Sequence, residues 1–331
     1  PTLRTPPAQK HRLPQSTHTP PQRERQPDSP NTTARTSNNR GDDMKNPTVD
    51  IIIPIHNAPH LTELCLNSVA TTLNPGKHRL ILINDGSELE TTEVVNVFAK
   101  KHQGTVVLQN PHAEGFTKSA NKGLRESSAQ MAIILNSDTQ VTSGWIEKLA
   151  ATLFGTNGVG IVGPLSNAAS YQSIPRTEPN PTEVLNRQTV INEIPPGFTI
   201  QTVNNYLESI KWGSAVRVPL IHGFCFALRA EVISEVGYFD DIAFPRGFGE
   251  ETDFCFRATD AGWGLAISPD TYVWHEKTGS YSLDTRARLT KIARSALLSK
   301  YGKKRIETAK GSLRSTAEYL QSRIGEFSYE Y

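Results

Sequence analysis

The stretch from Pro245 to Arg257 carries the residues best suited to chemistry. Three carboxylates, Glu250, Glu251 and Asp253, fall within four positions, with glycines before them and aromatic residues after them. Carboxylates that are crowded together and shielded from water repel one another and lose hydration, so the pKa of at least one would be raised. Such a carboxylate can act as a general base near neutral pH. The same residues also fit the start of a helix, in which Glu250 and Glu251 favour the helix dipole and Asp253 pairs with Arg257.

The elements that must position these carboxylates follow a regular pattern from Pro47 onward. Short, β-branched apolar runs alternate with segments whose apolar residues recur at helical spacing. This alternation predicts an α/β fold with a mainly parallel central sheet, with strands at 49–55, 80–83, 105–108 and 131–135. Ligands of such sheets bind beyond the carboxyl ends of the strands. Polar residues collect at these ends: His56-Asn57, Asp85-Gly86-Ser87 and Asn136-Ser137-Asp138.

Two of these strand ends suggest a nucleotide and a metal. Asp138 lies just after a strand, next to a polar residue. A carboxylate in this position would suit a divalent cation that also binds diphosphate oxygens. Asp85 could accept a hydrogen bond from a base N–H, and Gly86 would allow close approach. Each aspartate also has an ordinary interpretation, Asp138 as a helix N-cap and Asp85 as a turn residue.

Three further motifs leave alternatives open. The small residues from Gly115 to Gly123 fit close packing beside a nucleotide, and they fit helix capping equally well. His275, after Trp274, could be a metal ligand, a base or a core histidine. Residues 158–163 match the dinucleotide-binding G-x-G-x-x-G pattern, but they follow a predicted helix rather than a strand, so we interpret Val159–Val162 as another strand.

Composition separates a tail from a folded region. Residues 1–46 contain no Val, Ile or aromatic residue but eight of the 22 prolines, so we predict that this segment is disordered. The remainder carries 27 Lys and Arg against 29 Asp and Glu, which argues against a nucleic-acid binder. Cys65, Cys225 and Cys255 each lie in an apolar run, as expected of buried thiols in a reducing compartment. No apolar run approaches the ~18 residues that span a membrane.

Two later regions are less regular. Residues 172–210 show no strong periodicity and are predicted to form a long surface excursion. From residue 284 to 331 we expect two amphipathic helices, of which 284–314 carry ten Lys and Arg against two Asp and Glu. These helices could contact an anionic membrane surface. The simpler interpretation is a solvated helix face that packs on the preceding domain.

Taken together, four motifs in order resemble the family 2 glycosyltransferases. The resemblance covers residues 47–283 and implies the GT-A fold, a single Rossmann-like nucleotide-binding domain. The motifs are Ile53-Pro54-Ile55-His56-Asn57 with Asn84-Asp85-Gly86-Ser87; Gly115 to Gly123 with Ala120-Asn121 inside; Leu135-Asn136-Ser137-Asp138-Thr139; and Gly249 to Arg257 followed by Trp274-His275.

The resemblance assigns roles to individual residues. It implies that Glu251 is the catalytic base, with Glu250 as the other member of the acidic pair, and that Asp138 and His275 hold a divalent cation, Mn²⁺ or Mg²⁺. The residues that it places at the nucleotide sugar are Pro54, His56, Asn57, Asp85, Gly115, Asn121, Asn136 and Asp138. At the acceptor we expect Gly223, Trp274 and Trp145.

Two departures from the family pattern affect these roles. The sequence Asn136-Ser137-Asp138 replaces the usual Asp-x-Asp, so the metal site has one carboxylate fewer, and the base position holds Glu rather than Asp. The implied reaction is an inverting transfer from a nucleoside-diphosphate sugar to a hydroxyl of a saccharide or lipid-linked acceptor. The expected location is cytoplasmic, or peripheral at the inner face of the membrane. The alternatives are a nucleotidyltransferase and a non-catalytic carbohydrate-binding protein on the same fold.

Overall fold

The computed structural model describes residues 46–178, 190–194, 196–277 and 283–325. All of them belong to one compact unit, residues 39–331. The predicted disordered tail lies, except for Asn46, outside the described residues.

An eight-stranded sheet forms the centre of this unit, with the order β3-β2-β1-β4-β8-β6-β9-β7. Its first half is parallel, because β1 pairs in parallel with both β2 and β4, and β2 with β3. Every residue of β1 and β4 is buried, as expected for parallel strands covered on both faces. These strands are β1 (Val49–Ile55), β2 (His78–Asp85), β3 (Val106–Asn110) and β4 (Met131–Leu135).

The second half of the sheet is mixed. Strand β8 (Cys225–Arg229) lies antiparallel between β4 and β6 (Val159–Leu165), and β6 pairs in parallel with β9 (Gly264–Tyr272). Strand β7 (Val216–Val218) closes the edge. A separate antiparallel ribbon joins β5 (Thr139–Gln140) to β10 (Trp274–His275). The mainly parallel sheet expected from the sequence is therefore confirmed, with an antiparallel strand at its centre.

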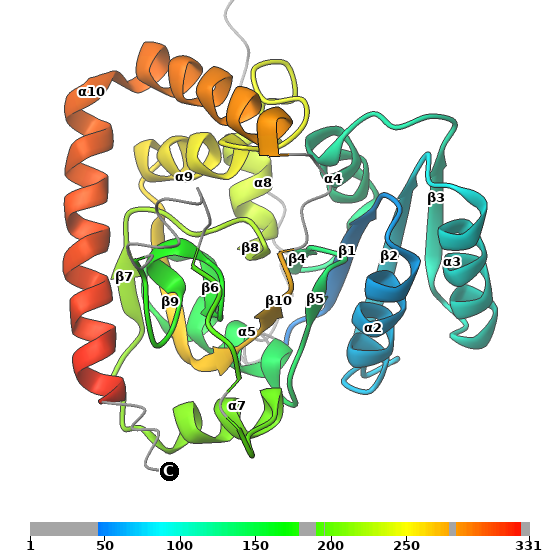
Figure 1. Ribbon diagram of the computed structural model, residues 1–331, viewed down its shortest axis with the longest axis horizontal. Coiled ribbons are helices and arrows are strands. Elements are labelled where there is room, and N and C mark those ends of the chain that lie inside the picture. The colour runs from blue at the N-terminus through cyan, green and yellow to red at the C-terminus, as the bar shows by residue number, and fades with distance from the viewer. Residues whose placement is uncertain (1–45, 179–189, 195, 278–282, 326–331) are drawn as a thin grey trace, which may run out of the picture. The chain divides into compact units, whose positions relative to one another are not determined.

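Helices cover both faces of the sheet (Figure 1). Ile51 and Ile53 of β1 point into a core with α2, α3 and α5, whereas Ile52 points into the core on the opposite face. The first layer comprises α2 (Pro59–Ala70), α3 (Leu89–Lys101) and α5 (Trp145–Gly155). The second comprises α4 (Phe116–Glu126), α7 (Ile200–Ser209), α8 (Ala230–Val236), α9 (Glu250–Asp260) and α10 (Leu283–Ile324), with the short 3₁₀ helix η1 (Ser170–Gln172) at its edge.

The structure decides two points that the sequence raised. Gly160 and Gly163 belong to β6, where a Cβ on either would lie 2.6 Å from a methyl group, of Val232 or Ile221, so these two glycines serve packing; Gly158 precedes the strand with φ 69°. The prediction of an irregular excursion over 172–210 is wrong for residues 200–209. There α7 buries Val203 and Leu207, one turn apart, and Thr199 caps its start.

Helix α10 contains both C-terminal helical stretches that the sequence predicts. Gly302 interrupts it with φ 74° and ψ 160°, which divides it into two helical halves. The second half buries Leu313, Ala317 and Leu320 against the domain. Lys300 and Arg305 hold the region of the break to Asp240 and Asp260 at 2.9 and 2.8 Å. In the described part of the chain, no helix is long and apolar enough to cross a membrane.

The three cysteines are buried thiols, as predicted. Burial raises the pKa of Cys65 to about 12, so its thiol is protonated at neutral pH.

Candidate active site

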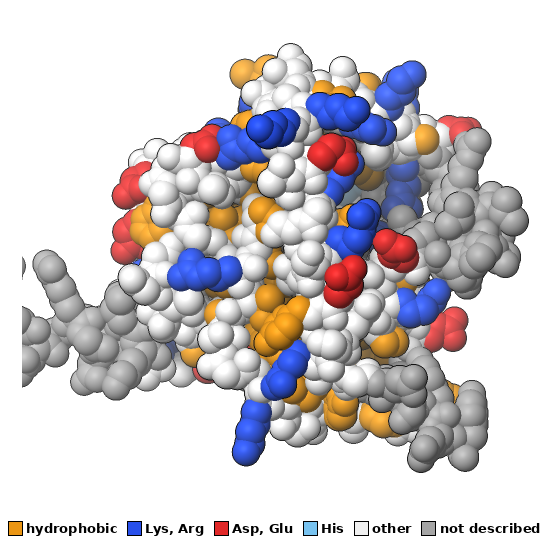
Figure 2. Space-filling model, turned by 90° about the vertical axis from the view of Figure 1, so that its left-hand side faces the viewer, with side chains coloured by type: hydrophobic (Ala, Val, Ile, Leu, Met, Phe, Trp, Pro, Cys, Tyr) orange, Lys and Arg blue, Asp and Glu red, His pale blue; other side chains and the backbone are white. Residues whose placement is uncertain are grey.

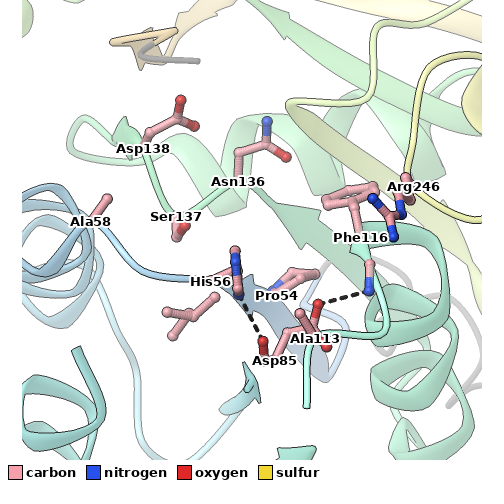
Figure 3. A pocket seen from close by; sticks show the side chains of 12 residues that line it. Pro54, His56, Ala58, Asp85, Ala113, Phe116, Asn136, Ser137, Asp138 and Arg246 are labelled. Atoms are coloured by element: carbon pink, nitrogen blue, oxygen red, sulfur yellow. Dashed lines mark hydrogen bonds between the residues drawn. The ribbon is translucent and has the colours of Figure 1, made fainter. Parts of the chain in front are cut away.

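A cleft of about 250 Å³ lies beyond the carboxyl ends of β1, β2 and β4. Figure 3 shows Asn136, Ser137 and Asp138 on one side, Asp85 on the opposite side, and Arg246 beside Phe116. The cleft thus lies where ligands of such sheets bind. It is lined by Pro54, Ile55, His56, Ala58, Asp85, Ala113, Gly115, Phe116, Asn136, Ser137, Asp138 and Arg246.

Asp85 forms the floor of the cleft and is 3% exposed. Its carboxylate accepts hydrogen bonds from Asn110 Nδ2 and from the backbone N–H groups of Glu114 and Gly115, all at 2.8–2.9 Å. Burial alone would raise the pKa of Asp85, but these hydrogen bonds outweigh it and hold the pKa below its usual value. Asp85 is therefore a fixed negative charge that also holds the loop before α4.

Two glycines bring this loop close to its neighbours. Gly86 has φ 60°, and a Cβ there would lie 2.4 Å from the backbone of Ala113. Gly115 has φ 97°, and a Cβ there would lie 2.5 Å from the carbonyl oxygen of Pro245. Gly86 therefore allows close approach of the chain's own backbone, and Gly115 lets the loop before α4 pack against the loop before α9.

His56 and Asn57 leave β1 in a constrained turn. The His56 ring lies 2.8 Å from the carbonyl oxygen of Asp85 through Nδ1, while most of the ring is open to solvent. Asn57 and Ala58 both have φ 58°, an unfavourable conformation for residues with a Cβ. The Asn57 side chain accepts from the N–H of Glu88 at 2.9 Å. Asn57 therefore shapes the rim of the cleft, and its side chain ties β1 to α3.

The β5–β10 ribbon brings Asp138 beside His275. Asp138 Oδ1 lies 3.4 Å from His275 Nε2, and the N–H of Glu276 donates to the carbonyl oxygen of Asp138 at 2.9 Å. His275 Nδ1 lies 3.2 Å from the carbonyl oxygen of Ala168, an arrangement that puts the proton on Nδ1 and the lone pair of Nε2 toward Asp138. Within the described residues, no group of three or more His, Cys, Asp and Glu side chains could hold a metal ion.

The segment from His222 to Phe224 forms the wall beside this pair. The Phe224 ring stacks on His275 at 5.3 Å between centroids, and the His222 ring lies 6.4 Å from His275. A Cβ on Gly223 would lie 3.4 Å from the Cβ of Glu251. The segment therefore links the Asp138–His275 pair to the acidic pair at the start of α9.

Glu250 and Glu251 occupy the first turn of α9. Glu250 is 4% exposed, and Gly249 N–H donates to Glu251 Oε2 at 3.1 Å. Burial and the neighbouring Glu251 charge raise the pKa of Glu250 well above its usual value. Burial also raises the pKa of Glu251, but backbone N–H groups at the helix start oppose this shift. Asp253 is paired with Arg257 at 2.8 Å, as the helix-start interpretation predicts.

Three buried side-chain atoms in the described part of the chain have no hydrogen-bond partner: Asn136 Oδ1, His222 Nδ1 and Glu250 Oε2. All three belong to residues of this region. Because a buried N–H without an acceptor is costly, His222 should carry its proton on Nε2. His222 would then offer an N–H to a ligand.

The remaining predicted residues lie apart from the cleft lining. Asn121 is buried and bonds the backbone N–H and carbonyl of Phe239 at 3.0 and 2.9 Å. Trp145 is fully buried in the core, and its Nε1 donates to Thr72 at 2.9 Å. Trp274 is partly buried in β10, and its Nε1 donates to Glu276.

The structure adds two cations that sequence reasoning missed. Arg246 lines the cleft from the loop before α9. Burial lowers the pKa of Lys277 to about 8, with the charge of Arg286 acting in the same direction and that of Asp138 opposing it. An isolated Arg or Lys gives no pattern in a sequence, so only the fold could find them.

Comparison with known proteins places the chain in a family. The sequence profile described as glycosyl transferase family 2 matches residues 50–237, more than half of the chain. Glycosyltransferase AglE of Haloferax volcanii is 25% identical over 230 residues, which cover 69% of this chain and 67% of that protein. The probable glycosyltransferase YdaM of Bacillus subtilis is 24% identical over 247 residues, 73% of this chain and 54% of that protein.

A solved structure shares the fold. It is the mannosyltransferase PcManGT of Pyrobaculum calidifontis, in complex with GDP-mannose and Mn²⁺. Its TM-score is 0.55 at 16% identity, over 84% of this chain and 73% of that one. The likeness confirms the GT-A fold.

Proposed function

The chain belongs to glycosyltransferase family 2, and on this basis we propose that it transfers a sugar from a nucleoside-diphosphate sugar to an acceptor hydroxyl, with inversion at the anomeric carbon. Family membership supports an enzyme rather than a carbohydrate-binding protein, and nothing in the cleft favours a nucleotidyltransferase. One observation carries the proposal. The Asp138–His275 pair and the Glu250–Glu251 pair flank a single wall, His222 to Phe224, beside the cleft at the strand ends.

The nucleotide of the donor would occupy the cleft above Asp85. The carboxylate is already held by backbone N–H groups, so it would face a base or ribose as a fixed acceptor. His56 and Pro54 would line the same pocket, and Arg246 is positioned to attract a diphosphate. The GDP-mannose in the structure of PcManGT supports a nucleotide-sugar donor, while the sugar and base of this chain's donor stay open.

Asp138 and His275 fit a divalent cation as a two-residue ligand set. A carboxylate oxygen and an imidazole Nε2 face each other, and the partner of Nδ1 fixes the tautomer that leaves Nε2 free to bind. A Mn²⁺ or Mg²⁺ ion held there would neutralise charge on the departing diphosphate as a Lewis acid. Two protein ligands would leave the remaining positions to water or to oxygens of the donor, so we expect metal affinity to rise when the donor is present.

Glu251 would act as the general base. As the acceptor oxygen bonds to the anomeric carbon and the bond to the diphosphate oxygen breaks, the Glu251 carboxylate takes the hydroxyl proton. Glu250, with its more strongly raised pKa, would keep its own proton and leave the pair with a single negative charge. Gly223 beside Glu251 leaves room for the acceptor.

The replacement Glu251→Gln tests the base. A positioned general base contributes roughly 10²–10⁴-fold in rate, so we expect transfer to fall by about that factor while donor binding survives. Transfer would be measured with a panel of sugar nucleotides, and donor affinity by calorimetry with Mn²⁺ present. The matched control is Glu63→Gln, on the exposed side of α2, which should transfer at the wild-type rate. Wild-type turnover in Glu251→Gln would exclude this residue as the base.

A further inference from the structure

A second cavity, of about 310 Å³, lies between the loop 243–247 and the first half of α10, residues 283–301. We call it the α10 groove. Most of its lining is apolar, its two charged residues are arginines, and it contains no acidic residue. The lining residues are Ala243, Phe244, Pro245, Arg246, Gly247, Arg288, Leu289, Ile292 and Ala293.

The α10 groove adjoins the active-site cleft. Arg246 lines both cavities. Gly247 lines the groove, and a Cβ added there would lie 3.8 Å from Glu250 Oε2 and 3.9 Å from Phe116 of the cleft. A molecule in the groove could therefore extend toward the acidic pair.

Among the described cations of α10, Arg288 lines the groove. Near the break, Lys300 and Arg305 are paired with Asp240 and Asp260. Figure 2 views the side on which the second half lies, and there basic and acidic side chains are interspersed. Residues 284–299 hold four cations against one acid, and none of the four forms an ion pair with a described acidic residue: Arg286, Arg288, Lys291 and Arg294. Lys303, Lys304 and Arg314 of the second half form none either, so Arg288 differs from them by its place in the groove rather than by its lack of an ion pair.

Apolar surface accompanies these unpaired cations. Ile292 lies one helical turn after Arg288 and is 54% exposed, although it lines the groove. A helix that only packed on the domain would bury such a residue, as the second half buries Leu313 and Leu320. An apolar strip beside two arginines matches a molecule with an apolar chain next to a phosphate, because Arg binds phosphate through paired N–H donors.

We propose that the α10 groove binds an acceptor in which a saccharide is joined through phosphate to an apolar chain. The chain would lie on Leu289 and Ile292, the phosphate between Arg246 and Arg288, and the saccharide hydroxyl at Glu251. This inference rests on the proposed function and adds to it the chemical class of the acceptor.

The first test uses dodecyl phosphate, below the concentration at which it forms micelles, as the probe of binding to the full chain. Dodecyl maltoside and inorganic phosphate are the neutral and headgroup-only comparisons. We expect dodecyl phosphate to bind at least about tenfold more tightly than either one, because dodecyl maltoside lacks the phosphate and inorganic phosphate lacks the apolar chain. Equal affinity of either comparison compound would overturn the proposal.

Variants then locate the site. Ile292→Asp and Arg288→Glu should each weaken dodecyl phosphate binding about tenfold or more, and Ile292→Ser serves if the aspartate variant does not fold. Leu89→Asp, at a position on α3 that is 71% exposed, is the matched control and should bind as the wild type does. Wild-type affinity in Ile292→Asp or Ile292→Ser would remove the groove as the site.

Donor hydrolysis without acceptor separates the two proposals. Neither Ile292 nor Arg288 lies in the donor cleft, so hydrolysis should be unchanged in both variants. A wild-type protein that hydrolyses no nucleotide sugar contradicts the proposed function itself. Intact hydrolysis combined with unaltered dodecyl phosphate binding in the groove variants contradicts only the assignment of the acceptor.

Discussion

Asp85 and Glu250 are both buried carboxyl groups beside the candidate active site, yet their surroundings shift their pKa values in opposite directions. Asp85 accepts three hydrogen bonds from N–H groups, and its pKa is lowered. Glu250 leaves Oε2 without a partner beside another carboxylate, and its pKa is raised. Around Asp85, on the side where we propose that the donor binds, the carboxylate already has its hydrogen-bond partners before any ligand binds. Beside Glu251, the proposed base, buried polar groups lack partners that a ligand could supply. We call these two regions the donor side and the side of the base. On the first side, satisfied hydrogen bonds fix the shape of the cleft; on the second, unsatisfied groups are available to bind or react with a ligand.

The largest expected effect tests the completeness of the donor side. Asp85→Ala leaves the part-buried backbone N–H groups of Glu114 and Gly115 without an acceptor, and leaves Asn110 Nδ2 with Ser119 Oγ alone, at about 1–3 kcal/mol for each group that loses its partner. We expect the free energy of unfolding to fall by about 3 kcal/mol or more, measured by urea denaturation. Asp284→Ala, at an exposed position, should change it by no more than about 0.5 kcal/mol. A variant of Asp85 as stable as the wild type would show that the donor side is not held together by this carboxylate.

The second prediction uses pH to test the opposite pKa shifts of Asp85 and Glu250. Because the folded state lowers the pKa of Asp85, its stabilisation is present above about pH 4 and is lost as the pH falls. The folded state raises the pKa of Glu250, so its contribution is present below about pH 4 and is lost as the pH rises through the folded pKa. The melting temperature of Glu250→Gln minus that of the wild type should therefore be more positive at pH 8 than at pH 4. For Asp85→Asn, the loss of melting temperature relative to the wild type should be larger at pH 8 than at pH 4.

The same variant also separates the two members of the acidic pair in catalysis. Glu250→Gln keeps the hydrogen-bonding shape and leaves Glu251 ionised, so transfer should fall by less than the roughly 10² minimum expected for loss of a base. A larger loss in Glu250→Gln than in Glu251→Gln would exchange their roles.

The smallest expected effect concerns the wall between the two pairs. His222→Phe removes the Nε2–H that we expect to face a ligand. A neutral hydrogen bond contributes roughly 1 kcal/mol, so transfer should fall by about fivefold. It also removes the buried Nδ1 that lacks a partner, so stability should hold or rise. Steady-state transfer and thermal melting of one preparation would check both. A loss of stability without a loss of transfer would make His222 a packing residue.

The sequence could predict the donor side better than the side of the base, for a physical reason. Buried parallel strands are contiguous apolar runs, so the positions of Asp85 and Asp138 at strand ends follow from local pattern. The direction of a side chain within a helix depends on partners far away in sequence. Asn121 lies within a small-residue motif, but its amide is engaged by Phe239, 118 residues later. Nothing local could show that.

The rest of the site could not be predicted because it arises where distant segments meet. Strand β8 is short, and only its position between β4 and β6 shows that it runs antiparallel. Arg246 and the apolar lining of the α10 groove come together because α10 returns across the loop before α9. The two helical stretches of α10 were readable from their periodicity, whereas the position of the break at Gly302 and the groove beside the first half came from the fold.

The two-residue ribbon of β5 and β10 has a consequence for how the enzyme matures. Its strands come from distant parts of the domain, and His275 pairs with Thr139 only when the sheet between them has formed. Contacts of such long sequence separation form late, because the entropy of closing the intervening chain must be met first. A partly folded chain therefore cannot hold Asp138 against His275. The newly made protein would complete the proposed cation site, on which the proposed use of a sugar nucleotide depends, only once the whole domain has folded.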